Sequence, residues 1–259
     1  MKNITIIGGG NLGTAMAEGL LKARYINIEN LTITKRNTQT LKSFEERGVR
    51  ILQDNKEAII NADIIILAVK PYQIQEILSG LEFKKNRIII STITGVSLNE
   101  LNQWIKNKAI LFRAMPNTAI SIQESMTCIC SNGVDKKSMN TVKTLFETQG
   151  KVIFIEENLM NAATVSGACG IAFAMRYIRA SIQGGIEIGF SAAQASLIVS
   201  QTILGAAELL LRTQTHPEQE IDKVTTPRGC TIAGLNEMEH RGFSSSVIKG
   251  VVASYEKIY

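Results

Sequence analysis

The sequence predicts an α/β fold in which a doubly wound, mostly parallel sheet is followed by an all-helical C-terminal domain. Short β-rich runs alternate with helical patterns through the first half of the 259-residue chain, and a glycine-rich turn directly follows the first run. β-Rich runs stop after about Glu156. Strands separated by helical crossovers run parallel, because each crossover returns the chain in the same direction. We therefore expect domains at residues 1–156 and 157–259.

The first domain is expected to contain eight strands with helices between them. The strands are predicted at Ile4–Ile7, Leu31–Thr34, Val49–Leu52, Ile64–Val69, Ile88–Ser91, Ile110–Arg113, Met126–Ser131 and Val152–Ile155. Helical spacing of apolar residues predicts helices at Asn11–Ala23, Thr38–Arg47 and about Asp135–Thr148.

The second domain is predicted to bury its helices against another copy of the chain. The stretch Leu159–Met175 carries no charge, and Ile203–Leu211 is nearly as apolar. Helices that are apolar around most of their circumference must be buried. A domain of about a hundred residues buries little of such surface by itself, which favours a homodimer or larger assembly through the C-terminal helices.

Composition and charge set limits on the class of protein. With 45% hydrophobic and 20% charged residues, the chain resembles an ordinary globular protein. The net charge is +5, but Lys and Arg are scattered, which disfavours nucleic acid as a partner. The first residues lack a signal-peptide pattern, and the longest apolar run, Ile64–Val69, is too short to span a membrane, so we expect a cytoplasmic protein without a membrane partner.

The cysteines and histidines predict neither disulfides nor a metal site. Cys128, Cys130, Cys169 and Cys230 form no C-x-x-C pair, and only two histidines are present. Reduced cysteines packed as small apolar side chains are the simpler interpretation.

The glycine-rich turn predicts a dinucleotide site. Gly8-Gly9-Gly10-Asn11-Leu12-Gly13 matches G-x-G-x-x-G between the first strand and the first helix. In this pattern Gly8 makes the tight turn, Gly10 admits the pyrophosphate and Gly13 lets the helix pack on the strand, while amides near Asn11 and Leu12 face the phosphates. The context therefore indicates a Rossmann-like domain.

The end of the second strand favours NADPH over NADH. NAD-binding proteins usually place an acidic residue there, whereas this chain has Thr34-Lys35-Arg36-Asn37. Hydroxyl, amide and cationic groups suit a 2′-phosphate. The alternative is a solvated basic turn that binds nothing, and NADH stays open as a second coenzyme.

Several short motifs, in this order and spacing, give the chain a resemblance to the pyrroline-5-carboxylate reductase family. They are Asn55-Lys56-Glu57, Ala68-Val69-Lys70-Pro71, Arg113 to Thr118, His216-Pro217 and Val224 to Leu235. The resemblance implies NAD(P)H-dependent reduction of the cyclic imine L-1-pyrroline-5-carboxylate to L-proline, the last step of proline biosynthesis. A protonated imine already accepts hydride well, so orientation and carboxylate binding suffice without a strong acid.

The resemblance also implies site residues in the first domain. Ala68, Val69, Lys70 and Pro71 would contact the cofactor near its ribose and nicotinamide, and Met115, Pro116 and Asn117 would wall the nicotinamide side. Asn55 would bond the adenine-side ribose, the alternative being a helix N-cap. For Pro71 the alternative is a structural proline at the end of a strand.

In the second domain, the turn Thr225–Thr231 is expected to lead into a helix at about Ile232 and to hold the substrate carboxylate. The substrate-binding residues would be Thr226, Arg228, Gly229, Cys230 and Thr231. The Thr231 hydroxyl would face the ring nitrogen and is the one catalytic candidate, with a helix N-cap as the alternative.

The chain departs from the family at two places, which leaves other functions open. Ala168-Cys169-Gly170-Ile171-Ala172-Phe173 replaces the family's Gly-Ser-Gly-Pro-Ala-Tyr, and Arg228-Gly229 replaces Gly-Gly. One alternative is a β-hydroxyacid dehydrogenase, but no Lys lies between Asn158 and Arg176 to act as its acid or base. The other is a non-catalytic regulatory protein that binds NADPH.

Overall fold

The sheet of the first domain is the element that positions the candidate site. The computed structural model describes residues 2–106 and 109–258. Its strands form one eight-stranded sheet in the order β3-β2-β1-β4-β5-β6-β7-β8. The strands are β1 (Ile4–Ile7), β2 (Leu31–Thr34), β3 (Arg50–Leu52), β4 (Ile64–Leu67), β5 (Ile88–Ser91), β6 (Ile110–Met115), β7 (Ser125–Ser131) and β8 (Gly150–Phe154).

All neighbouring strands pair in parallel except β6 and β7, which are antiparallel. The predicted α/β class and the doubly wound, mostly parallel sheet are therefore confirmed. The strands β1, β2 and β5 have the predicted bounds, while β4 ends at Leu67 because the chain there turns toward a helix that starts at Pro71.

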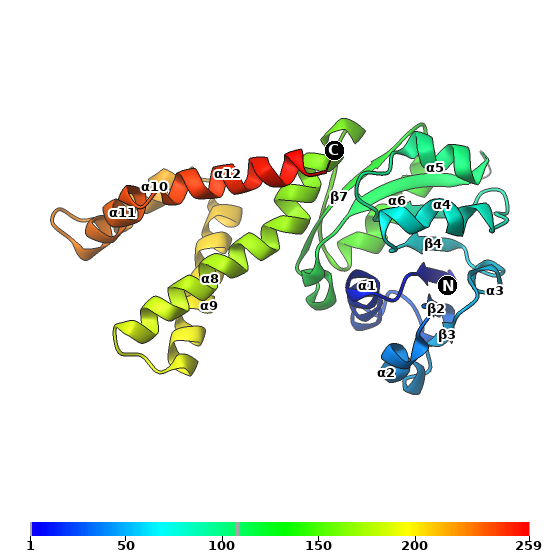
Figure 1. Ribbon diagram of the computed structural model, residues 1–259, viewed down its shortest axis with the longest axis horizontal. Coiled ribbons are helices and arrows are strands. Elements are labelled where there is room, and N and C mark those ends of the chain that lie inside the picture. The colour runs from blue at the N-terminus through cyan, green and yellow to red at the C-terminus, as the bar shows by residue number, and fades with distance from the viewer. Residues whose placement is uncertain (1, 107–108, 259) are drawn as a thin grey trace. The chain divides into compact units, whose positions relative to one another are not determined.

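Helices cover both faces of this sheet (Figure 1). Those of this region are α1 (Asn11–Lys22), α2 (Lys42–Glu46), α3 (Asn55–Ile59), α4 (Pro71–Ser79), α5 (Leu98–Ile105), α6 (Lys136–Glu147) and α7 (Met160–Ala163). The helix predicted over Thr38–Arg47 is wrong in part, because its first residues, Thr38–Leu41, form a 3₁₀ helix that Asn37 caps by accepting a hydrogen bond from Gln39 N.

Strand alternation divides the core into two layers. In β4, Ile64 and Ile66 pack with α1 and α6 residues such as Leu20 and Phe146. Ile65 and Leu67 face the other layer, with side chains of α4 and α5. Such double burial explains why these strands are continuous apolar runs.

The chain separates into two compact units, Met1–Cys169 with Lys257–Tyr259, and Gly170–Glu256. Met1 and Tyr259 lie outside the described residues. A π-helix, Thr164–Cys169, ends the first unit's main segment, and the departure Ala168–Phe173 falls across this division. The boundary at residue 156 stays a prediction.

All regular secondary structure of the second unit is helical, and short loops join its helices. It contains α8 (Gly170–Glu187), α9 (Ala192–Thr213), α10 (Pro217–Val224), α11 (Cys230–His240) and α12 (Phe243–Glu256). By length and composition alone, helix α9 is long and apolar enough to cross a membrane, and 6% of its 18-residue apolar stretch is buried. Leu197, Leu204 and Leu211 recur along it every seven residues and are 72%, 55% and 66% exposed.

Candidate functional site

A pocket of about 1040 Å³ opens at the carboxyl edge of the sheet. Its wall follows the strand order β2, β1, β4, β5. We call it the carboxyl-edge pocket, and its lining residues are Ile7, Gly8, Gly9, Gly10, Asn11, Leu12, Thr34, Lys35, Arg36, Asn37, Gln53, Asn55, Ala68, Val69, Lys70, Pro71, Gln73, Glu76, Ile77, Thr92, Ile93, Thr94 and Thr118.

The glycines of the first turn have separate geometric roles. A Cβ atom at Gly8, whose φ is +111°, would overlap the carbonyl oxygen of Ala68, and one at Gly13 would overlap the carbonyl oxygen of Gly8. A Cβ at Gly10 would meet no heavy atom within 4 Å. Gly8 and Gly13 are therefore required by packing, whereas the space in front of Gly10 is open to a ligand.

The N-terminus of α1 presents backbone amides that suit an anion. Gly10 is its N-cap and provides no side-chain hydrogen bond, and the first turn has no acidic residue. The first amides of a helix have no intrahelical acceptor and carry partial positive charge. Gly8 N and Gly9 N both donate to Thr34 O, at 3.2 and 2.8 Å, so the amides at Asn11 and Leu12 are among the donors left for a phosphate.

The β2 end of the pocket carries the cations. Lys35 is partly exposed and Arg36 is exposed, whereas Thr34 is buried. The Thr34 hydroxyl donates to Asn55 Oδ1 at 2.6 Å. Lys35 and Arg36 are thus able to approach a phosphate. The Thr34 hydroxyl instead holds the Asn55 side chain by its hydrogen bond.

Asn55 is not the N-cap of its helix, so that alternative is wrong. Asp54 is the N-cap of α3, because its backbone is extended and its Oδ1 accepts from Lys56 N at 2.7 Å. Asn55 is the first helical residue and lines the pocket. Its side chain is therefore available to a ligand.

Pro71 is the first residue of α4, and Lys70 is its N-cap. A proline suits this position, because the missing N–H would have no helical partner and φ is already fixed near the helical value. The alternative of a strand-ending proline is wrong, since β4 stops at Leu67.

The three residues predicted to form the pocket wall after β6 do not line the pocket. Met115 and Pro116 are buried, and Asn117 Nδ2 donates to Gly167 O at 3.1 Å while its Oδ1 accepts from Ala119 N. None of these residues, nor Gly13, lines the pocket, and Thr118 does. Asn117 caps a 3₁₀ helix, Thr118–Ile122.

Sequence reasoning missed the contribution of β5. Thr92, Ile93 and Thr94 line the pocket directly after that strand ends at Ser91. The rule that singled out the end of β4, that ligands bind beyond the carboxyl ends of parallel strands, applies equally here.

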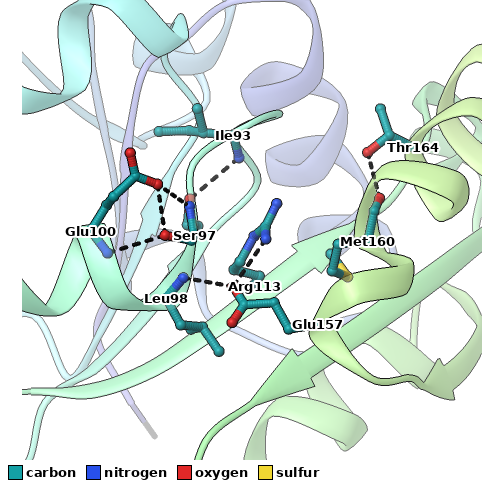
Figure 2. A network of polar contacts seen from close by, with 9 residues as sticks. Ile93, Ser97, Leu98, Glu100, Arg113, Glu157, Met160 and Thr164 are labelled. Atoms are coloured by element: carbon teal, nitrogen blue, oxygen red, sulfur yellow. Dashed lines mark hydrogen bonds and ion pairs between the residues drawn. The ribbon is translucent and has the colours of Figure 1, made fainter. Parts of the chain in front are cut away.

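A network of polar contacts lies behind this β5 wall (Figure 2). Ser97 caps α5 by accepting from Glu100 N, and it donates its hydroxyl to the Glu100 carboxylate at 2.6 Å. The Ser97 hydroxyl and the Ser97 backbone N–H both donate to Glu100 Oε2, and these two hydrogen bonds lower the pKa of Glu100 below its usual value. Next to this cap the buried Arg113 forms an ion pair with the partly exposed Glu157, with Nη1 and Oε1 3.0 Å apart.

The Thr225–Thr231 loop of the second unit is a tight turn followed directly by a helix. Gly229 N donates to Thr226 O at 2.9 Å, and a Cβ at Gly229 would overlap the Thr226 hydroxyl. Arg228 has a left-handed backbone with φ +58°. Helix α11 begins at Cys230, earlier than the predicted Ile232, because the turn closes at Gly229.

Thr231 is the second residue of α11 and not its N-cap, which is Gly229. Its side chain is partly buried. The hydrogen bonds within residues 2–106 and 109–258 leave the Thr231 hydroxyl without a protein partner. The N-cap alternative is therefore wrong, and the hydroxyl is available to a ligand.

The described part of the chain holds no group of three or more His, Cys, Asp or Glu side chains that is suited to a metal ion. Burial raises the pKa of the Cys130 thiol to about 11, so that cysteine stays neutral at physiological pH.

Known proteins resemble the chain along its whole length. A family model described as pyrroline-5-carboxylate reductase dimerisation matches residues 157–259, and one described as NADP oxidoreductase, coenzyme F420-dependent, matches residues 3–95. Pyrroline-5-carboxylate reductase 2 of Dictyostelium discoideum is 39% identical over 274 residues, which cover 99% of this chain and 92% of that protein.

Two further comparisons agree. Pyrroline-5-carboxylate reductase 1 of the same organism is 42% identical over 98% of this chain, which spans only 49% of that longer protein. The crystal structure of Plasmodium falciparum pyrroline carboxylate reductase with NADP bound superposes with a TM-score of 0.92 at 27% identity, over 99% of this chain and 97% of that one.

Proposed function

Because the chain belongs to the pyrroline-5-carboxylate reductase family, we propose that it reduces L-1-pyrroline-5-carboxylate to L-proline with NADPH, the last step of proline biosynthesis. The observation that carries the proposal is the carboxyl-edge pocket, with its uncapped helix N-terminus and the cations Lys35 and Arg36 at one end. The full-length relatives supply the reaction.

The residues of the pocket fit NADPH in the order of the strands. Lys35 and Arg36, after β2, would hold the 2′-phosphate, and the amides of Asn11 and Leu12, after β1, would hold the diphosphate. Asn55 would bond the adenine-side ribose. Ala68, Val69, Lys70 and Pro71, after β4, would then lie toward the nicotinamide, with the β5 residues Thr92–Thr94 beyond them. NADH lacks the 2′-phosphate, and we propose it as the poorer coenzyme.

The loop before α11 would bind the substrate. Its amides, at the positive end of α11, suit a carboxylate, and Arg228 adds a cation. The Thr231 hydroxyl would hydrogen-bond the ring nitrogen and orient the ring. When bound, NADPH would supply a hydride to the carbon of the protonated imine, and the C=N π electron pair would become the lone pair of the amine nitrogen. No metal is required for this step.

The exposed apolar helices support a homodimer or larger assembly as the working form. Leu197, Leu204 and Leu211 form a stripe of exposed side chains on α9, and a second copy would bury it. Burial between two copies accounts for the apolar surface of α9 without a membrane, although the length and composition of this helix would also allow it to span one. The enzyme would then work in the cytoplasm.

The test is oxidation of NADPH, followed optically, with pyrroline-5-carboxylate as the only acceptor. Turnover that depends on both compounds, with proline as the product, supports the proposal. Tight binding of NADPH without turnover would instead favour a non-catalytic regulatory protein. Oxidation of a β-hydroxyacid in place of imine reduction would favour the dehydrogenase alternative.

A further inference from the structure

One carboxylate oxygen of Glu157 connects three segments of the first unit. Glu157 Oε1 accepts from Arg113 Nη1 of β6 at 3.0 Å and from Leu98 N at 2.7 Å. Leu98 is the first residue of α5, and Glu157 itself begins a 3₁₀ helix, Glu157–Leu159. Figure 2 shows the Leu98 N–H and the Arg113 guanidinium meeting at the Glu157 carboxylate, below the loop that contains Ile93.

Glu157 supplies the negative charge nearest to the buried Arg113 guanidinium. The Arg113 side chain is 5% exposed, and its Nε and Nη2 have no hydrogen-bond partner within residues 2–106 and 109–258. Over the same residues, Glu157 is the one acidic side chain in salt-bridge contact with it, and the Glu100 carboxylate interacts with its charge from a greater distance. A buried cation is strongly destabilising once its partner is removed, so the Glu157 charge holds the guanidinium in place.

The same carboxylate fixes one end of the β5 wall of the pocket. At its start, Thr92 N and Thr92 Oγ1 both donate to Leu67 O, at 3.0 and 2.9 Å. At its end, the Ser97 cap and the Leu98 N to Glu157 hydrogen bond hold the first turn of α5. Residues 92–94, which line the pocket, lie between these two attachments.

We propose that Glu157 is a positioning residue which, through Leu98 N–H and the Arg113 guanidinium, holds the 92–94 wall of the carboxyl-edge pocket against the nicotinamide end of the coenzyme. The proposal rests on the proposed function, because that function assigns NADPH to the pocket. Lys35 and Arg36 lie at the other end, after β2, with β1 and β4 between. Glu157 is therefore expected to affect only one end of the ligand.

Glu157→Gln tests the charge, with Glu147→Gln as the matched control. Glu147 forms an exposed pair with Lys143 on α6 and takes no part in the hydrogen bonds of Glu157. NADPH and adenosine 2′,5′-bisphosphate, which carries only the adenine and its phosphates, are titrated against each variant. We expect Glu157→Gln to lower kcat and NADPH affinity about tenfold, as a small misplacement of a reacting group does. The affinity for adenosine 2′,5′-bisphosphate should stay within about twofold of the wild type.

Leu98→Pro tests the hydrogen bond separately and serves where Glu157→Gln folds poorly. Proline is favoured at the first residue of a helix, and of the backbone groups it removes only the N–H that donates to Glu157. Leu98→Ala is its control, because Leu98 is buried and alanine loses the same packing while keeping the N–H. A lower kcat in Leu98→Pro than in Leu98→Ala supports the proposal.

Two results would overturn the positioning role. One is an unchanged kcat and NADPH affinity in both Glu157→Gln and Leu98→Pro, each compared with its control. The other is an equal loss of NADPH and adenosine 2′,5′-bisphosphate binding, which indicates a general loss of structure. Wild-type turnover decides the proposed function independently of either result.

Discussion

The Thr34 hydroxyl donates a hydrogen bond to Asn55 Oδ1 at 2.6 Å, across the β2 end of the pocket. This contact uses the oxygen of the amide, so Asn55 Nδ2 is left to donate to a ligand. Asn55→Asp keeps the shape and the contact with Thr34 but replaces the donor by an anion. We expect the Kd for NADPH to rise about tenfold, because a donor is lost and like charges approach. Calorimetric titration measures it, and an unchanged Kd would exclude a ligand contact for Asn55.

The cations after β2 should determine coenzyme choice. Replacing Lys35 and Arg36 by Ala is expected to raise the KM for NADPH about tenfold per cation, since charge-assisted hydrogen bonds to a phosphate are lost. The KM for NADH should hardly change. Lys143→Ala on α6 is the control for loss of a surface cation. Equal effects on both coenzymes would show that these side chains do not contact a 2′-phosphate.

Alanine substitutions at two glycines of the same motif should have different effects, one on NADPH binding and the other on stability. Gly10→Ala is expected to keep the melting temperature of the wild type and to bind NADPH weakly, because its methyl group fills only open space. Gly13→Ala is expected to lose about 1–3 kcal/mol of unfolding free energy, because its methyl group overlaps the Gly8 carbonyl. Thermal unfolding and NADPH titration on both variants check this contrast, and the reverse pattern would contradict it.

Thr231→Ala should reduce kcat with little loss of stability. The hydroxyl does not cap α11, so the helix keeps its start at Gly229 and Cys230. We expect kcat to fall about tenfold or more, because a group that orients the substrate is lost. Thr231→Ser should retain most of the activity. A Thr231→Ala variant with wild-type kcat would remove only this residue from the proposed site.

The apolar stripe of α9 should control assembly. Leu204→Asp, at the centre of the stripe, is expected to convert the oligomer to monomers, since burying an unpaired charge costs several kcal/mol. Ile60→Asp, an exposed apolar residue of the first unit at 54% exposure, is the control. Sedimentation velocity distinguishes the species. An oligomer that persists in Leu204→Asp would place the interface elsewhere.

The Ser97–Glu100 cap should contribute a pH-dependent part of stability. The folded-state pKa of Glu100 is lowered from 4.5 by hydrogen bonds from Ser97. Its contribution is therefore fully present above that unfolded value and is lost as the pH falls through the lower folded value. Glu100→Gln should flatten the unfolding free energy against pH below about 4.5. A wild-type slope in the variant would contradict this assignment.

Strands and the glycine turn could be predicted from the sequence because each depends on local pattern. Continuous runs such as Ile64–Leu67 are buried on both faces, and Gly8 and Gly13 occupy positions that admit no side chain. The end of β6 could not be predicted in this way. The strand β6 continues for two residues past its predicted end at Arg113, in antiparallel pairing with β7, so Met115 is its last residue and Pro116 follows it. Both residues are buried, whereas Ala68 and Val69, which follow β4, line the pocket.

The N-cap of a helix was the second feature that the sequence could not predict. Asp54 and Asn55 both suit an N-cap, and only the backbone geometry decides that Asp54 takes the role and Asn55 faces the pocket. The Arg113–Glu157 pair joins residues 44 positions apart, which no local pattern connects.

Under the proposed function, the left-handed backbone of Arg228 sets a cost in folding stability against a gain in substrate binding. A residue with a Cβ atom costs roughly 1–2 kcal/mol more than glycine in this conformation. A lineage selected only for heat resistance would therefore drift toward glycine at this turn. Arginine at this position therefore exchanges thermal tolerance for a positive charge beside the proposed substrate site.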